Sequence, residues 1–285
     1  MKRFLLLLVL LAFALIGLGL FTAMRDPVVR RLTVHMRDWP AGAPPMRVVL
    51  LSDLHAAGPE TPPSRLARIV AQVNALQPDL VLIAGDFEQE RTLSTRTYDA
   101  AEATAPLAGL RARYGVVAVL GNHDYSDDGT TDLPPWLARR GITLLRNSAV
   151  RRGPLTIAGA DDLYHRKFRG HLLDQAARAL PGPTLVLSHT PDVVPFLPNY
   201  PLLLAGHTHC GQIVPPLIGP LTAESALGLR YVCGLIREPG RDVLVTAGIG
   251  TSGVPLRIGA VPDLWLLTID GVPPETIRKS AAIRH

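Results

Sequence analysis

Short apolar runs alternate with polar segments along the central part of the chain. Five of these runs are four or five residues long and rich in branched side chains, which is typical of strands buried on both faces. They cover 47–51, 80–84, 116–120, 184–187 and 202–205. Further strands are expected at 31–37, 143–145, 155–158, 243–246 and 265–269, and helices at 62–76, 98–110 and 134–140. This alternation predicts an α/β fold with two sheets flanked by helices.

The first 25 residues form a different kind of segment. Lys2 and Arg3 precede an uninterrupted apolar run over 4–24, and about 20 such residues are enough to cross a bilayer as a helix. A signal peptide has a shorter apolar core and small residues at its cleavage site. We therefore interpret 1–25 as an uncleaved, single-pass transmembrane anchor, followed by a connector over 26–45 that contains an edge strand.

The charges around this anchor give contradictory indications of its orientation. Lys2 and Arg3 favour a cytoplasmic N-terminus, which would place the rest of the chain outside the cytoplasm. Four arginines after the run favour the opposite orientation: Arg25, Arg30, Arg31 and Arg37. Both orientations stay open at this point.

Length and composition limit the remainder of the chain after the anchor. The chain has 285 residues, 47% of them hydrophobic, which suits one large domain over 46–272 and a short tail over 273–285. The net charge is +5, but the arginines are scattered without aromatic residues for stacking, so we expect no nucleic-acid partner. We interpret the arginines as a solvated basic surface, with attraction to an anionic membrane leaflet as the alternative. Cys210 and Cys233 fit either compartment and are too few to predict a disulfide framework.

Polar motifs follow each of the five buried runs. They are Asp53-Leu54-His55, Gly85-Asp86, Gly121-Asn122-His123-Asp124, Ser188-His189 and Gly206-His207-Thr208-His209. The carboxyl ends of strands in α/β sheets gather reactive groups at one rim. Carboxylate, imidazole and amide ligands without a thiolate cage suit Zn, Mn or Fe. We therefore predict two divalent metal ions at this rim.

Each motif residue can be given a role in such a centre. Asp86 has two carboxylate oxygens and stands alone in its motif, so it is the natural bridge between ions about 3.5–4 Å apart. The first ion is assigned Asp53, His55 and His209. The second ion is assigned Asn122, His189 and His207. His123 remains free to move a proton, and Asp124 either orients the His123 ring or lies at the surface.

Taken together, the five motifs resemble those of the calcineurin-like metallophosphoesterases, over roughly 46–269. Strings at 141–148, 158–162, 187–192, 211–213 and 248–257 are similar to one bacterial, often membrane-anchored branch of that family. The resemblance implies a four-layer α/β/β/α sandwich, metal ligation by the seven residues assigned above, and a catalytic role for His123. One departure is Cys210, where this branch usually has Gly; it is expected to place an oxidisable thiol beside two ligands.

The resemblance also implies a function. We expect a phosphoesterase of the bacterial inner membrane that cleaves a phosphodiester or pyrophosphate by attack of a metal-bridging hydroxide, with His123 protonating the leaving oxygen. The branch includes hydrolases of UDP-2,3-diacylglucosamine, a lipid A precursor, so a lipid-linked substrate is one hypothesis. An exported phosphodiesterase or phosphomonoesterase acting on cell-envelope phosphates is the alternative, and a metal-free scaffold is a remote one.

Substrate choice is expected to lie in the loops around the rim. Its predicted walls are 56–64, 125–135 and 161–171. The apolar, proline-broken segment 213–221 is interpreted either as a segment packed on the core or as a lip that receives acyl chains. His165 and His171 are interpreted as ordinary surface histidines.

Overall fold

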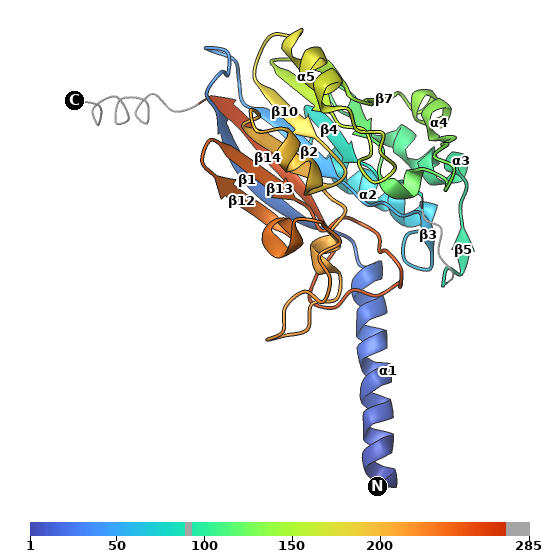
Figure 1. Ribbon diagram of the computed structural model, residues 1–285. Coiled ribbons are helices and arrows are strands. Elements are labelled where there is room, and N and C mark those ends of the chain that lie inside the picture. Colours follow the sequence, from blue (N-terminus) through green and yellow to red (C-terminus); the bar gives the residue numbers. More distant parts are fainter. Residues whose placement is uncertain (89–92, 272–285) are drawn as a thin grey trace, which may run out of the picture.

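The computed structural model describes residues 1–88 and 93–271 and has two six-stranded sheets packed face to face (Figure 1). The predicted tail over 273–285 lies outside the described residues. The first sheet has the strand order β1 (Val28–Met36), β14 (Asp263–Gly271), β2 (Met46–Leu51), β4 (Leu80–Ala84), β6 (Val116–Val119), β7 (Ile142–Leu144). From β2 to β7 its strands are parallel, whereas β14 is antiparallel to β2.

The second sheet has a parallel centre with an antiparallel strand at each edge. Its order is β12 (Gly234–Glu238), β13 (Arg241–Val245), β11 (Leu202–Ala205), β10 (Thr184–Leu187), β9 (Leu155–Gly159), β8 (Ser148–Arg152). β12 is antiparallel to β13, and β8 is antiparallel to β9. Both sheets are therefore mixed, and there are two of them, as the sequence predicts.

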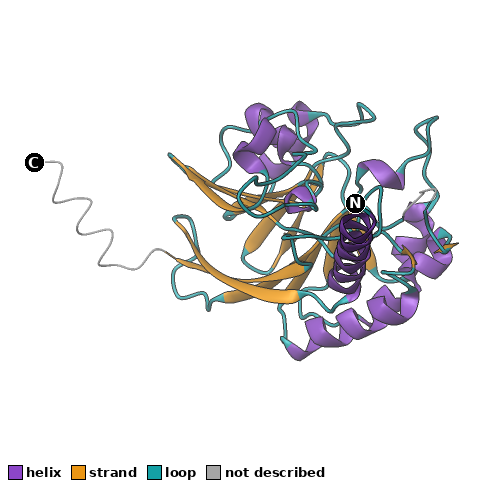
Figure 2. Cartoon of the chain, turned by 90° about the horizontal axis from the view of Figure 1, so that it is seen from below, coloured by secondary structure: helices purple, strands orange, loops and turns teal. Residues whose placement is uncertain are grey.

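Helices cover the outer faces of both sheets, which completes four layers (Figure 2). The first sheet packs against α2 (Pro63–Ala75), α3 (Ala100–Thr104) and α4 (Leu133–Arg139), and the second against α5 (Gly170–Arg178). In β2, Val49 and Leu51 face the helices, while Val48 and Leu50 face the other sheet. Because both faces of the strand are buried, its sequence is a continuous apolar run.

Short elements complete the fold. A two-stranded ribbon pairs β3 (Ala57–Gly58) with β5 (Arg96–Thr97). The helix expected at 98–110 is instead α3 followed by a 3-10 turn, η1 (Ala105–Gly109), because Pro106 has no backbone N–H to continue an α-helix. The other 3-10 turns are η2 (Asn122–Asp124), η3 (Pro191–Phe196), η4 (His209–Gly211) and η5 (Gly228–Tyr231).

The N-terminal helix α1 (Lys2–Met24) projects from the domain (Figure 1). Its length and apolar composition are sufficient to cross a membrane, and only 6% of its most apolar stretch is buried. Gly19 and Ala23, near its end, are buried against the domain. The edge strand expected at 31–37 is β1, which begins three residues earlier, at Val28, and pairs with β14 over its whole length.

Candidate metal centre

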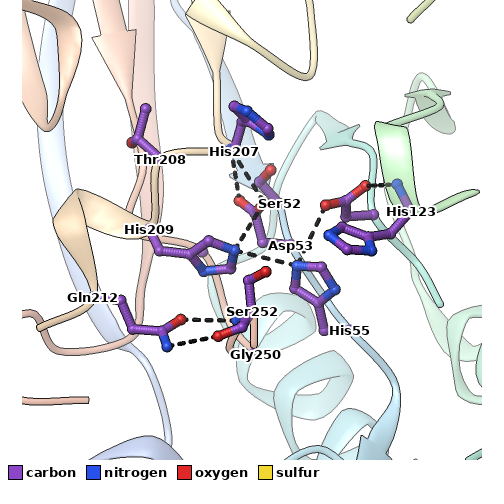
Figure 3. Close-up of polar contacts among 12 residues, drawn as sticks. Ser52, Asp53, His55, His123, His207, Thr208, His209, Gln212, Gly250 and Ser252 are labelled. Carbon is purple, nitrogen blue, oxygen red and sulfur yellow. Dashed lines mark hydrogen bonds and ion pairs between the residues drawn. The ribbon is translucent and has the colours of Figure 1, made fainter. Parts of the chain in front are cut away.

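All eight residues that the sequence singles out lie at one end of the two sheets. Asp53 and His55 follow β2, Asp86 follows β4, and Asn122 and His123 belong to η2 after β6. From the second sheet, His189 follows β10, and His207 and His209 follow β11. The carboxyl ends of both sheets therefore supply one shared rim (Figure 3).

Five of these residues have a backbone conformation in the left-handed region, with positive φ. Their φ values are 53° at Asp53, 42° at His55, 55° at Asp86, 71° at His207 and 49° at His209. Such a conformation is uncommon for residues other than glycine, costs of the order of 1–3 kcal/mol each, and is concentrated at functional sites. Gly121 shows how tight the rim is, because a Cβ atom there would lie 2.1 Å from Oδ1 of Asp86.

Asp53, His55 and His209 form the first cluster. Nε2 of His55 lies 3.2 Å from Nε2 of His209, which in turn lies 3.7 Å from Oδ1 of Asp53 (Figure 3). All three side chains are buried. Two imidazole nitrogens and a carboxylate oxygen that converge without solvent suit a cation.

Asp86, His189 and His207 form the second cluster. Nε2 of His189 lies 3.0 Å from Nδ1 of His207 and 3.0 Å from the side-chain oxygen of Asn122. Asp86 also reaches the first cluster, since its Oδ2 lies 3.3 Å from Nε2 of both His55 and His189. Asp86 is thus the side chain between the two candidate sites.

The charge states of these groups follow from burial and from Asp86. Burial lowers the pKa of His55 to about 3. Burial and the nearby His189 lower the pKa of His207 to about 4. Both imidazoles are therefore neutral at pH 7. Burial would also lower the pKa of His189, but the adjacent Asp86 carboxylate raises it to about 10. His189 in turn helps to hold the pKa of Asp86 well below its usual range, against the effect of burial.

Asp124 takes neither of the roles expected for it. It is buried, and its carboxyl oxygens accept hydrogen bonds from the backbone N–H groups of Asp86, Phe87 and Gly121 at 2.7–2.8 Å. It orients backbone around the shared ligand, not the His123 ring. The sequence interpretation was wrong because it considered only neighbours in the chain, whereas two of these donors come from the loop after β4.

His123 lies beside the clusters. Its backbone N–H donates to Oδ1 of Asp86 at 2.9 Å, and its ring packs edge-on against His55 with centroids 5.1 Å apart (Figure 3). The side chain is half-buried and lines the cavity above the rim. A group of this kind can exchange protons with a bound molecule.

That cavity has a volume of about 840 Å³. Asp86, Asn122, His123, His207 and His209 lie in its lining, together with Tyr125, Asp127, Tyr164 and His165 from two of the predicted walls. The described lining includes no lysine or arginine. The charge of a bound phosphate would therefore be met by cations held on the rim.

Some predictions about the walls need correction. His165 is not an ordinary surface residue, because it lines the cavity and its Nδ1 lies 2.9 Å from Oδ2 of Asp162. The lining does not include the predicted wall 56–64, but it does include Glu224, Ser225 and Ala226, which were missed. Their only signal in the sequence is a polar break after the apolar segment 213–221.

A buried arginine contacts His209, and the next residue in the chain, Cys210, is part of a disulfide. The buried guanidinium of Arg257 lies 3.2 Å from Nδ1 of His209 and donates to the carbonyl oxygens of Ala247 and Gly250, both at 2.6 Å.

Cys210 is not the free thiol that the sequence predicts, because it forms a disulfide with Cys233. The prediction failed here because the pairing depends on the fold bringing the two residues together, which spacing alone does not reveal.

The model of the calcineurin-like phosphoesterase family matches residues 46–211. The chain belongs to this family. The four-layer sandwich and the two candidate metal sites are consistent with that membership.

Several proteins with similar sequences are named as metallophosphoesterases or as containing a metallophosphoesterase domain. The chain is 35% identical over 268 residues to a "Transmembrane protein with metallophosphoesterase domain" from Danio rerio, covering 86% of this chain and 58% of that protein. A "Putative metallophosphoesterase" from Caenorhabditis elegans is 32% identical, with 93% and 56% covered. "Uncharacterized metallophosphoesterase YkuE" from Bacillus subtilis is 30% identical, with 81% of each chain covered. The chain thus spans less than two thirds of the two animal relatives.

Proposed function

We propose that the chain is a membrane-anchored phosphoesterase that uses two divalent ions, Mn, Zn or Fe, to hydrolyse a phosphodiester or pyrophosphate bond. The observation that carries this proposal is the placement of Asp86, whose Oδ2 lies 3.3 Å from an imidazole nitrogen of each cluster. One carboxylate within reach of both candidate sites is the arrangement that a two-metal centre requires.

The residues present fit a pair of ions. Asp53, His55 and His209 would hold the first, and Asn122, His189 and His207 the second, with Asp86 shared. When bound, the ions would make water a stronger acid and offset the negative charge that develops on the phosphoryl oxygens. His123 would donate a proton to the departing oxygen, since it lines the cavity beside both clusters.

We further propose that α1 is a single-pass anchor in a bacterial inner membrane. The helix is long and apolar enough to span a bilayer, and relatives from Danio rerio and Bos taurus are named as transmembrane proteins. An anchored enzyme has ready access to lipid-linked phosphates, of which UDP-2,3-diacylglucosamine is one candidate.

The disulfide favours a second candidate function. Disulfides persist in oxidising compartments and are rare in the cytosol, so the pairing of Cys210 with Cys233 supports a catalytic domain outside the cytoplasm. There the substrate would be a phosphodiester or phosphomonoester of the cell envelope, because a nucleotide-linked lipid precursor belongs to the cytoplasmic side. Lys2 and Arg3 favour the same orientation.

Metal analysis and hydrolysis of bis-p-nitrophenyl phosphate by the full chain test the proposed chemistry. We expect a chelator to abolish turnover and added Mn²⁺, Zn²⁺ or Fe²⁺ to restore it, with two ions bound per chain. Binding of no divalent ion, together with no metal-stimulated turnover, would leave a metal-free scaffold as the better description. A C-terminal reporter fusion then separates the two substrate classes, because an external reporter signal excludes the cytoplasmic precursor.

A further inference from the structure

The rim that carries the candidate metal ligands lies at the same end of the domain as α1. Three residues separate the end of α1 from β1, whose first residue, Val28, pairs with Asp263 of β14. β14 is antiparallel to β2, and Trp265 pairs with Leu50 near the end of β2. The start of β1 therefore lies beside the carboxyl end of β2, where the metal ligands begin (Figure 1).

The anchor is packed against this rim instead of being loosely tethered to it. Gly19 approaches the loop after β13 so closely that a Cβ atom would lie 3.3 Å from the side chain of Leu256. The backbone N–H of Arg257 donates to the carbonyl oxygen of Gly19 at 3.1 Å, and Arg65 donates to that of Arg25 at 2.5 Å. These contacts fix how the domain is oriented relative to α1.

An exposed apolar loop lies on the same side. The segment 215–221 contains Leu217, Ile218 and Leu221, which are 107%, 73% and 58% exposed, and no charged residue occurs from 213 to 223. Figure 1 shows this segment below the domain, on the side from which α1 emerges. Exposed apolar side chains that cluster in one loop are typical of an interaction site.

The base of the loop is joined to the anchor. Val214 N–H donates to the carbonyl oxygen of Ile258 at 2.7 Å, and Leu221 N–H donates to that of Ile213 at 3.2 Å. Ile258 is also one of the residues that Gly19 of α1 approaches. With α1 in a bilayer, the loop is therefore held close to the same bilayer.

We propose that the rim docks on the membrane that α1 crosses, with the segment 215–221 inserted at the boundary between headgroups and acyl chains. Insertion of apolar side chains to this depth is what holds monotopic segments on bilayers. A smaller cavity of about 240 Å³, lined by Ile213, Leu221 and His209, lies between the loop and the metal ligands. The inserted loop would thus bring the bilayer surface to the edge of the active site.

Quenching by brominated lipids tests this docking without any measurement of hydrolysis. The full chain carrying Ile218→Trp is reconstituted in phosphatidylcholine vesicles with or without bromine on the upper acyl carbons, and the signal of the unsubstituted chain is subtracted. We expect the added fluorescence to fall at least about twofold in the brominated vesicles, since interfacial side chains lie about 5–10 Å deep. Leu217→Trp provides an independent second position with the same expectation.

The matched control is Ala41→Trp, in the turn between β1 and β2 at the opposite end of the sheet. Its added fluorescence should be the same in both vesicles. Equal intensities for Ile218→Trp and Leu217→Trp with and without bromine would overturn the proposal. A blue shift without quenching would also overturn it, because the loop would then be covered by protein, such as a second copy of the chain. Loss of phosphoesterase activity would bear on the proposed function alone.

Discussion

The carboxyl group of Asp124 accepts a hydrogen bond from the backbone N–H of Asp86 at 2.8 Å, so a residue next to the proposed proton donor fixes the ligand shared by both clusters. It also accepts hydrogen bonds from Phe87 and Gly121. The loops after β4 and β6 are therefore held together by one buried side chain. The position of Asp86 depends on this contact as well as on its own strand.

Replacing Asp124 by Asn should weaken metal binding without removing a ligand. The amide keeps one acceptor oxygen, so part of the backbone network stays unsatisfied, and losses of this kind reduce metal affinity about 10–100-fold. Competition with a fluorescent chelator measures the change. Asp128→Asn, in an exposed turn, is the control and should bind metal like the parent chain. Unchanged affinity in a folded Asp124→Asn variant would show that the contact does not position Asp86.

Asp86→Ala should disturb both candidate sites at once. Because the carboxylate lies between the clusters, we expect the bound divalent ions, measured by elemental analysis, to be lost or greatly reduced. Turnover should fall at least about a hundredfold, since changes outside the ligand shell alone reach that size. Asp270→Ala, at the far end of β14, should keep both properties. Retention of two ions by Asp86→Ala would exclude a bridging role.

His123→Ala should separate chemistry from metal binding. A general acid contributes about 10²–10⁴-fold when the leaving group is poor. We therefore expect a loss of this size with an alkyl phosphodiester, and a much smaller loss with a nitrophenyl ester, whose leaving oxygen needs no proton. The metal content should stay unchanged. Equal losses with both substrates would argue against proton donation.

Metal binding should release a proton from His189. The pKa of this imidazole is about 10 in the metal-free protein, with Asp86 offsetting the effect of burial, so the ring carries a proton at pH 7 that a bound cation must displace. Apparent affinity should then rise about tenfold per pH unit between pH 7 and 9. Calorimetry in buffers of different ionisation enthalpy counts the protons. His165→Gln should leave this count unchanged, whereas binding without proton release would contradict the assignment.

Removing the disulfide should lower stability. Cys210 and Cys233 are 23 positions apart, and a cross-link closing a loop of that size contributes about 3 kcal/mol to the free energy of unfolding. Cys233→Ser should therefore unfold at a lower temperature in calorimetry. A reductant should bring the parent chain to the same level and leave the variant unaffected. If the reductant has no effect on the parent chain, the bond is absent or contributes nothing.

The sequence was sufficient to predict the central strands of both sheets because they are buried on both faces. Val48 and Val49 face different layers, yet both are fully buried, so the apolar pattern reports the strand directly. β8, by contrast, has only half-buried and exposed residues, with Arg151 and Arg152 among them, and it was not predicted. Its pairing with β9 depends on tertiary contacts.

In the candidate site, too, some residues could be predicted from the sequence and others could not. The motif residues follow strand ends, so their meeting at one rim follows from topology. Arg257 and Asp124 could not be assigned in this way, because their partners are backbone groups. Arg257 donates to carbonyl oxygens of its own loop, and Asp124 accepts from an N–H group in the loop after β4. Nothing in the local sequence distinguishes a buried arginine that binds carbonyl oxygens from an exposed one.

The three-residue link between α1 and β1 has a consequence for kinetics. With α1 in a bilayer and a lipid-linked substrate, as proposed above, the domain would stay at one height above the bilayer and meet its substrate by lateral diffusion in two dimensions. Its rate should therefore follow the mole fraction of substrate in the leaflet, and dilution of the vesicles at constant lipid composition should leave the rate per enzyme unchanged. For such an enzyme, the composition of the surrounding lipid sets the effective substrate concentration.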